Sequence, residues 1–115
     1  MTRHIILWKL NESLSPEEKA RVMTDIREGL EGLSGKIPGL LSIRVFTPAI
    51  SSSTADLMLD STFASPEAFA LYKEHPAHLE VANGRVRPFV QVRLSFDYSQ
   101  RFHILLTSCP SFTIQ

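Results

Sequence analysis

The sequence has little cysteine: Cys109 is the only one in 115 residues. A single thiol cannot form an internal disulfide, and such sparse cysteine is typical of proteins of the reducing cytosol. Together with the four histidines (His4, His75, His78 and His103), it shows no zinc-ligand spacing. We therefore expect a cytoplasmic protein with neither a disulfide framework nor a bound metal.

The chain also lacks an excess charge of either sign and any long apolar run. Twelve basic and 12 acidic residues cancel, and no basic run is present, so we expect no nucleic-acid partner and no anionic membrane surface as partner. The apolar stretches are far shorter than the roughly 20 residues that span a bilayer, and no signal-peptide pattern opens the chain. No Gly-rich phosphate loop or nucleophile elbow occurs, and we expect no cofactor.

Two segments begin with the same helix-start pattern. Ser15-Pro16-Glu17-Glu18 combines an N-cap serine, a proline at the first helical position and a glutamate that can close a capping box. Ser65-Pro66-Glu67 repeats the serine and the proline. We expect the first helix to end at residues 34–36, where Gly35 suits a left-handed cap. One apolar stripe runs along this helix, made of Val22, Met23, Ile26, Leu30 and Leu33.

Four further segments have the pattern of β-strands, at residues 3–10, 40–47, 55–63 and 89–98. The order is therefore β-α-β-β-α-β. We predict an α+β, ferredoxin-like fold, in which the helices cover one face of a four-stranded antiparallel sheet. We expect residues 1–98 to form this domain and residues 99–115 to be a tail. Within the tail, residues 103–107 are either a fifth strand that docks at a sheet edge or part of a disordered end.

The sheet face away from the helices has a mixed composition. We expect Leu41, Ile43 and Val45 on the helix side of the second strand, and Val92 and Leu94 on the helix side of the fourth. The opposite face would then carry Ser42, Arg44, Phe46, Asp56, Met58, Asp60, Gln91, Arg93 and Ser95. A solvated face needs no large apolar residues, and an ordinary core would not hold four charges. A homodimer interface, with apolar anchors and Arg–Asp pairs across it, explains both features.

Side chains able to do chemistry crowd together in Tyr72-Lys73-Glu74-His75-Pro76-Ala77-His78. Pro76 disfavours a helical conformation at His75, the residue before it, and is well placed to begin a new helical turn. We therefore expect a helix through about Tyr72, a break at His75 and a second helix that carries His78. A break of this kind can hold Tyr72 and His78 side by side.

His78 and Tyr72 are candidate catalytic residues. A histidine with an ordinary pKa near 6.5 can accept a proton at neutral pH, and a phenol can hold a developing oxyanion. The alternative is structural: His78 hydrogen-bonds the broken helix and Tyr72 is a half-buried core aromatic. Candidate lining residues of a ligand pocket are His4, Trp8, Met23, Ile26, Leu57 and Leu59. The apolar residues at such periods are usually plain core, and a histidine such as His4 more often bonds a backbone carbonyl at a strand end.

Several pieces of the chain, taken together and in order, resemble a known family. They are Arg3-His4-Ile5-Ile6-Leu7-Trp8-Lys9-Leu10, Gly35-Lys36-Ile37-Pro38-Gly39, Ser61-Thr62-Phe63 with Ser65-Pro66-Glu67-Ala68, Tyr72 with His75-Pro76-Ala77-His78, and Phe96-Asp97-Tyr98. The sequence is similar to the stress-responsive dimeric α/β barrel (Dabb) proteins over about residues 2–98. This resemblance implies a homodimer in which two four-stranded sheets form a barrel, which agrees with the two-faced sheet.

One plant member of that family, olivetolic acid cyclase, is a cofactor-free polyketide cyclase that closes a ring by aldol condensation. The resemblance places its Tyr and His at Tyr72 and His78, and a supporting His at His4. A further pocket His of the cyclase falls at Leu57, where the match departs. Two hypotheses remain: a homodimer that binds a small apolar or aromatic molecule without turnover, with a role in stress response, and a cofactor-independent, cyclase-like enzyme.

Overall fold

The computed structural model describes residues 1–100. Its elements, in chain order, are β1 (Thr2–Leu10), α1 (Pro16–Glu31), β2 (Leu40–Phe46), β3 (Leu57–Phe63), α2 (Pro66–Glu74), α3 (Pro76–Val81), a π-helical turn (Ala82–Val86), a 3-10 turn (Arg87–Phe89) and β4 (Val90–Ser99). The third strand thus begins two residues later than we expect from the sequence. The possible strand at residues 103–107 and Cys109 lie outside the described residues.

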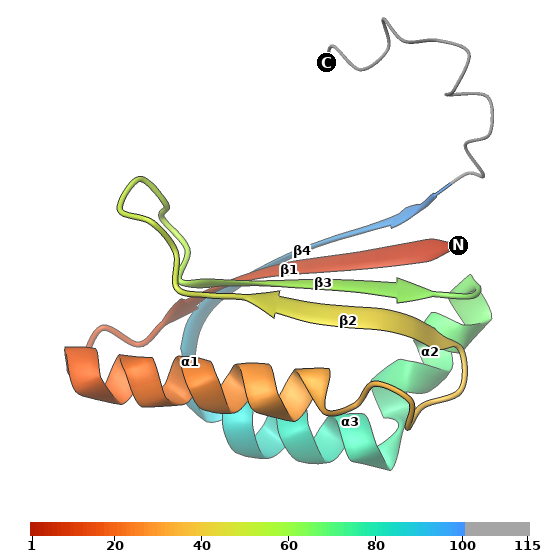
Figure 1. The fold of residues 1–115 in the computed structure, drawn as a ribbon, viewed down its shortest axis with the longest axis horizontal. Helices are drawn as coiled ribbons and strands as arrows, with labels where there is room; N and C mark the ends of the chain where they lie inside the picture. Colours follow the sequence, from red (N-terminus) through yellow and green to blue (C-terminus); the bar gives the residue numbers. More distant parts are fainter. Residues whose placement is uncertain (101–115) are drawn as a thin grey trace, which may run out of the picture.

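The four strands form one antiparallel sheet in the order β2-β3-β1-β4. All three α-helices lie on the same side of this sheet, and the long connection between β2 and β3 projects beyond its end (Figure 1). The predicted α+β, ferredoxin-like β-α-β-β-α-β fold is therefore confirmed. No helix in residues 1–100 has the length and hydropathy needed to cross a membrane.

Both helix starts form as the sequence predicts. At α1, the Glu18 backbone N–H donates to the Ser15 hydroxyl over 3.1 Å, and the Ser15 N–H donates to the Glu18 carboxylate over 2.8 Å. At α2, the Ser65 hydroxyl accepts from the Ala68 N–H. The first helix ends at Glu31, before the predicted stop, and the chain continues in turns to Gly35, whose φ of +79° is the left-handed conformation that glycine favours.

The predicted place of Leu41 on the helix side of β2 is wrong. Leu41 is 54% exposed, whereas Leu40 is buried in the core beside Ile43 and Val45. The cause is a register shift between Leu40 and Ser42, where β2 has one residue more than its partner strand β3. An irregularity of this kind interrupts the strict alternation of side chains that the prediction assumes.

The predicted orientation of β4 is also wrong. Arg93 lies opposite Trp8, and Ser95 lies opposite Ile6, so both share the helix side with these buried β1 residues. The open face instead receives the apolar alternate residues of the strand, namely Val92, Leu94 and Phe96. The strand is exposed along most of its length. Because so little of β4 is buried within the chain, burial does not decide which of its sides faces the helices.

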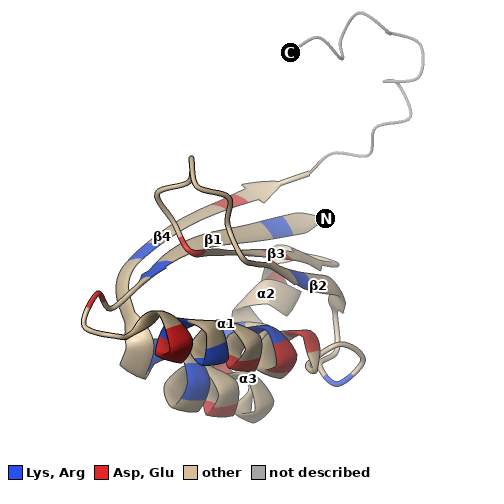
Figure 2. Ribbon diagram, turned by 60° about the vertical axis from the view of Figure 1, so that its left-hand side comes forward, with Lys and Arg blue, Asp and Glu red and all other residues tan. Residues whose placement is uncertain are grey.

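The open face of the sheet consequently carries continuous rows of side chains across all four strands. One row is Phe46, Met58, Leu7 and Leu94, and the next is Arg44, Asp60, Ile5 and Phe96. Both charged residues of the second row have partners within the chain. Asp60 forms an ion pair with Arg3, and Arg44 lies over the Phe46 ring. Most of the charged positions of the chain lie on the helices, and the strands carry few (Figure 2).

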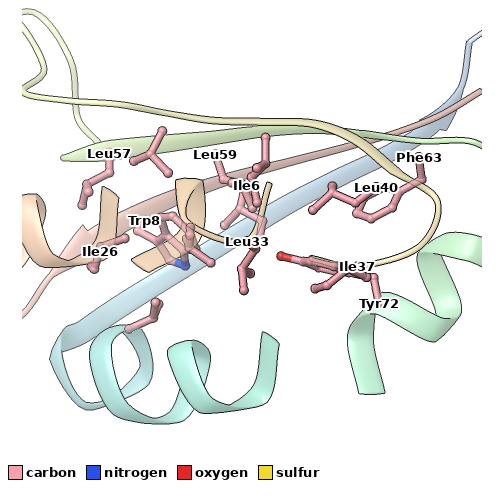
Figure 3. Close-up of a cluster of buried hydrophobic side chains, with 14 of the residues drawn as sticks. Ile6, Trp8, Ile26, Leu33, Ile37, Leu40, Leu57, Leu59, Phe63 and Tyr72 are labelled. Carbon is pink, nitrogen blue, oxygen red and sulfur yellow. The ribbon is translucent and has the colours of Figure 1, made fainter. Parts of the chain in front are cut away.

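The hydrophobic core fills the space between the helices and the sheet (Figure 3). Leu10, Ile26 and Phe63 are completely buried there. A fully buried apolar side chain of this size contributes about 1.5–3 kcal/mol to folding.

Candidate functional site

The break between α2 and α3 forms where the sequence predicts it. His75 has an extended backbone, with ψ at 134°, and its imidazole Nδ1 accepts a hydrogen bond from the Ala77 N–H over 3.1 Å. His75 therefore acts as the N-cap of α3, a role that the sequence analysis missed. The break brings the Tyr72 and His78 rings to a centroid distance of 4.3 Å.

A cavity of about 340 Å³ opens beside these two rings. Its volume falls within the range of small-molecule sites. Its lining comes from the sheet and from the helical segments on both sides of the break: His4, Ile6, Trp8, Leu30, Leu59, Tyr72, Lys73, His78, Ala82, Val86, Arg87, Val90, Gln91 and Arg93.

Of the eight residues singled out from the sequence, five line this cavity: His4, Trp8, Leu59, Tyr72 and His78. The other three, Met23, Ile26 and Leu57, do not. Ile26 and Leu57 are buried in the core between α1 and the sheet, and the Met23 sulfur accepts a hydrogen bond from the Thr47 hydroxyl. Their apolar periods reflect ordinary packing, which is the alternative that periodicity could not exclude.

Tyr72 brings a hydroxyl group into a dry environment. The residue is only 1% exposed, and its hydroxyl has no hydrogen-bond partner among the described residues. Figure 3 shows this hydroxyl directed away from α2 and toward the middle of the layer between helices and sheet. Burial raises the pKa of Tyr72 far above its ordinary value of 10, so the phenol stays protonated at neutral pH. A buried donor without a partner is available to a ligand oxygen.

His78 has the protonation state that a general base needs. Burial lowers the pKa of His78 below its ordinary value of 6.5, and the imidazole is therefore neutral at pH 7. Its Nδ1 lies 3.2 Å from the Lys73 carbonyl oxygen. A carbonyl can only accept, so Nδ1 carries the hydrogen and Nε2 keeps the lone pair that can take a proton.

His4 lies on the sheet wall of the cavity, on β1, and its contacts fix the orientation of its ring. It is 4% exposed, its ring lies 4.6 Å from the Phe69 ring centroid, and its Nδ1–H donates to the Asp97 carboxylate. Burial lowers the pKa of His4, and the nearby Asp97 offsets only part of this effect. The imidazole is therefore neutral at pH 7, with the hydrogen on Nδ1. A carboxylate in this position fixes the tautomer and orientation of a histidine.

Sequence reasoning missed the part of the cavity that follows α3. The Asn83–Gly84 pair lies within a π-helical turn that extends the helix through Val86. This turn brings Ala82 and Val86 to the cavity wall. Insertions of this kind are frequent at functional sites. No local signal marks them, because a π turn depends on packing against its surroundings.

Polar and charged groups at the cavity were also missed. Lys73, Arg87 and Arg93 line it, and Arg93 does so because β4 has the opposite orientation to the predicted one. Within residues 1–100, no three His, Cys, Asp or Glu side chains gather in an arrangement that could hold a metal ion. The chemistry that these residues can provide is therefore hydrogen bonding, charge recognition and proton transfer by imidazole.

Comparisons with known proteins agree with this fold. A dimeric protein of unknown function with a ferredoxin-like fold from Bacteroides fragilis is similar, with a TM-score of 0.81 and 28% identity, covering 86% of this chain and 95% of that chain. A Dabb family protein from Mesorhizobium loti has a TM-score of 0.67 and 23% identity, with coverages of 88% and 97%.

A hydroxynitrile lyase from Passiflora edulis has a TM-score of 0.65 and 19% identity, and the match covers 88% of this chain and 95% of the lyase chain. At that identity the likeness shows the fold alone. No curated protein matches the chain. The profile of the stress responsive A/B barrel domain matches residues 2–100. Since this is nearly the whole sequence, the chain belongs to the stress-responsive A/B barrel domain (Dabb) family.

Proposed function

We propose that the protein is a homodimer that binds a small apolar or aromatic molecule in the cavity between its helices and its sheet. The observation that carries this proposal is the cavity itself, which reaches about 340 Å³ and is lined from both the helices and the sheet. Its walls combine apolar side chains such as Ile6, Leu59 and Val86 with a few polar groups. Ligand sites typically have this composition.

The open face of the sheet supports the homodimer. It bears exposed Leu7, Phe46, Leu94 and Phe96 in adjacent positions. A contiguous apolar patch of this kind marks an interaction surface on a folded protein. The similar protein from Bacteroides fragilis is described as dimeric. A second copy of the chain, facing this surface with its own sheet, would bury the patch symmetrically.

Binding can be followed through Trp8, which is the single tryptophan and lines the cavity. We expect 4-phenylbutan-2-one, a small aromatic ketone, to change its fluorescence in a saturable manner. Ala82→Phe should abolish this change, because Ala82 lines the cavity and the new ring would fill it. Ala70→Phe is the matched control, since Ala70 is exposed on α2. Saturable binding that survives Ala82→Phe would place the ligand elsewhere and refute the proposal.

A second candidate function is proton transfer next to a carbonyl group, as in a cyclase-like enzyme that needs no cofactor. The observation that favours it is the pairing of an unpartnered Tyr72 hydroxyl with a neutral His78 in one cavity. Nε2 of His78 would remove the proton, and the Tyr72 hydroxyl would stabilise the enolate oxygen. Leu57, which replaces a histidine of the plant cyclase, lies in the core and not at the cavity, so His4 would be the other imidazole available.

Deuterium exchange tests this second function without knowledge of the natural substrate. A base at the cavity should catalyse exchange of the hydrogens next to the carbonyl of 4-phenylbutan-2-one in D₂O, observed by NMR. His78→Ala and Tyr72→Phe should each slow the protein-catalysed exchange by roughly 100-fold or more. His75→Ser, which keeps an N-cap residue at the break, is the control and should leave the rate unchanged. Binding of the ketone without exchange would eliminate catalysis but leave the binding function.

A further inference from the structure

The charged groups at the cavity all have the same sign. Three side chains that carry a full charge at neutral pH line it, namely Lys73, Arg87 and Arg93. No Asp or Glu is among the lining residues of the described chain. This asymmetry contrasts with the balanced composition of the whole sequence, which has 12 basic and 12 acidic residues.

None of these three cations forms an ion pair within residues 1–100, although Arg3, Lys9, Arg44 and Arg85 do. Lys73 lies over the Phe69 ring, with its Nζ 4.6 Å from the ring centroid. Arg87 donates one hydrogen bond, to the Asn83 side-chain oxygen. Residues 101–115 contain no Asp or Glu side chain that could neutralise them.

The two arginines belong to consecutive elements that border the cavity. Arg87 begins the 3-10 turn, and Arg93 lies on β4 directly opposite Trp8. Both are exposed residues that also line the cavity, which places them at its mouth. Trp8 itself is 3% exposed, so the wall next to the arginines is apolar. A molecule in the cavity would have its apolar body against Trp8 and one end near the guanidinium groups.

We propose that the ligand is a carboxylic acid with an aromatic or alkyl body, whose carboxylate is held by Arg93 and Arg87 while the body occupies the cavity. This inference rests on the proposed small-molecule binding and specifies its ligand class. A guanidinium group donates two parallel hydrogen bonds that match the planar carboxylate, and the pairing is stronger than one between neutral groups. The cavity is small and largely apolar, which suits an organic acid better than a polyphosphate.

The effect of the arginines on His78 supports the same placement. Burial is the main cause of the lowered pKa of His78, and the positive charges of Arg87 and Arg93 lower it further. Arg93 acts on the pKa of His4 in the same direction. Arg87 and Arg93 thus both act on His78, and Arg93 also acts on His4, in agreement with their shared place in the cavity lining. A ligand anchored at Arg93 would have the rest of its length directed along β1 toward His4.

The test compares three molecules that differ only at one end: 4-butylbenzoate, its methyl ester and 4-butylbenzamide. Affinities are measured by isothermal titration calorimetry, with Trp8 fluorescence as a second readout. The loss of a charge-assisted pair is expected to weaken binding by about 10- to 100-fold, so the acid should bind at least tenfold more tightly than the ester and the amide. Its affinity alone should fall as salt is added, because the ester and amide are neutral.

Variants then assign this preference to the mouth of the cavity. The double variant Arg87→Gln with Arg93→Gln should bind all three molecules with the affinity that the wild type has for the ester. Arg85→Gln removes the same charge from the neighbouring π turn, where Arg85 pairs with Asp25 away from the lining, and should keep the preference. Circular dichroism checks that each variant is folded.

The outcomes separate this inference from the function on which it rests. Equal affinities for acid, ester and amide would overturn the carboxylate assignment and leave the binding function standing. A preference that persists in the double variant would overturn the assignment to these arginines. Displacement of 4-butylbenzoate by an equimolar amount of inorganic phosphate would show a phosphate site instead. If none of the three molecules binds, the carboxylate inference fails, and binding of 4-phenylbutan-2-one decides whether the proposed binding function fails with it.

Discussion

The two faces of the sheet use the same four strands for opposite purposes. On the helix side, β1 presents His4, Ile6 and Trp8, all nearly inaccessible. On the open side, the intervening residues Ile5 and Leu7 lie in rows with the apolar residues of β4. The helix side thus contains both the core and the cavity within one chain, whereas the open side has an apolar surface that nothing within residues 1–100 covers.

Apolar character and burial are therefore separate properties in this molecule. Phe63 and Phe96 are both phenylalanines on strands of one sheet, yet Phe63 is inaccessible and Phe96 is 68% exposed. An apolar residue on the helix side stabilises the single chain, whereas an apolar residue on the open side should stabilise the proposed homodimer.

The largest effect is expected for Phe63→Ala. The ring contacts Phe69 and Tyr72, with centroids 5.1 and 4.8 Å away, so its removal should reduce the free energy of unfolding by about 3–5 kcal/mol. Phe96→Ala should change this free energy by less than about 0.5 kcal/mol. The comparison is made by urea denaturation in a monomeric Leu94→Asp background, so that association does not contribute. Equal losses for the two variants would contradict the division between the faces.

The next largest effect is expected on the association of two chains into a dimer. Leu94→Asp would place an unpaired charge in the middle of the open face, and a buried, unpaired charge costs about 3 kcal/mol or more. Sedimentation equilibrium should show a dimer for the wild type and a monomer for this variant at micromolar concentration. Leu71→Asp is the control, because Leu71 is 69% exposed on α2, away from the sheet. A dimer that persists in Leu94→Asp would move the interface elsewhere.

A smaller effect, of opposite sign, is expected for Tyr72→Phe. Removing a buried hydroxyl without a partner relieves a desolvation penalty, so the free energy of unfolding should increase by about 1 kcal/mol. Tyr98→Phe on the open face should change it little, since Tyr98 is partly exposed. A stability gain at Tyr72, together with slower deuterium exchange, would indicate that the hydroxyl is retained for function. A loss of stability in urea denaturation would show that this hydroxyl has a partner.

The smallest expected effect is a decrease in the free energy of unfolding at acidic pH. The pKa values of His4 and His78 are lowered in the folded protein, mainly by burial, with hydrogen bonds offsetting part of the shift. Below about pH 6.5, the unfolded chain takes up protons that the folded protein does not, so the free energy of unfolding falls as the pH decreases through the folded pKa values. Above that pH, both histidines are neutral in both states and have no effect.

Urea denaturation at several pH values between 7.5 and 5 checks this expectation. His78→Gln should reduce the loss of stability in acid, because it removes one of the two groups. A wild-type protein whose stability increases on acidification would mean that the attraction of Asp97 for His4 outweighs burial.

Much of the fold was predictable because its signals are local. The capping box of α1, the N-cap serine of α2, the positions of the strands and the Pro76 break depend on residues close together in sequence, and each forms at or near the predicted place. The approach of His78 to Tyr72 followed from that break. On β1, the resemblance to the family pointed to His4, and the structure places Trp8 on the same side of the strand.

The amino-acid sequence by itself determined the element order, the family and the position of the helix break, since each rests on short-range patterns. Which side of β4 faces the helices, where the bulge in β2 falls, and that Arg87 and Arg93 line the same cavity depend on the tertiary structure. These features depend on pairing between strands far apart in the chain and on how tightly the helices pack. A change of one residue in register reverses the side that every residue of a strand faces.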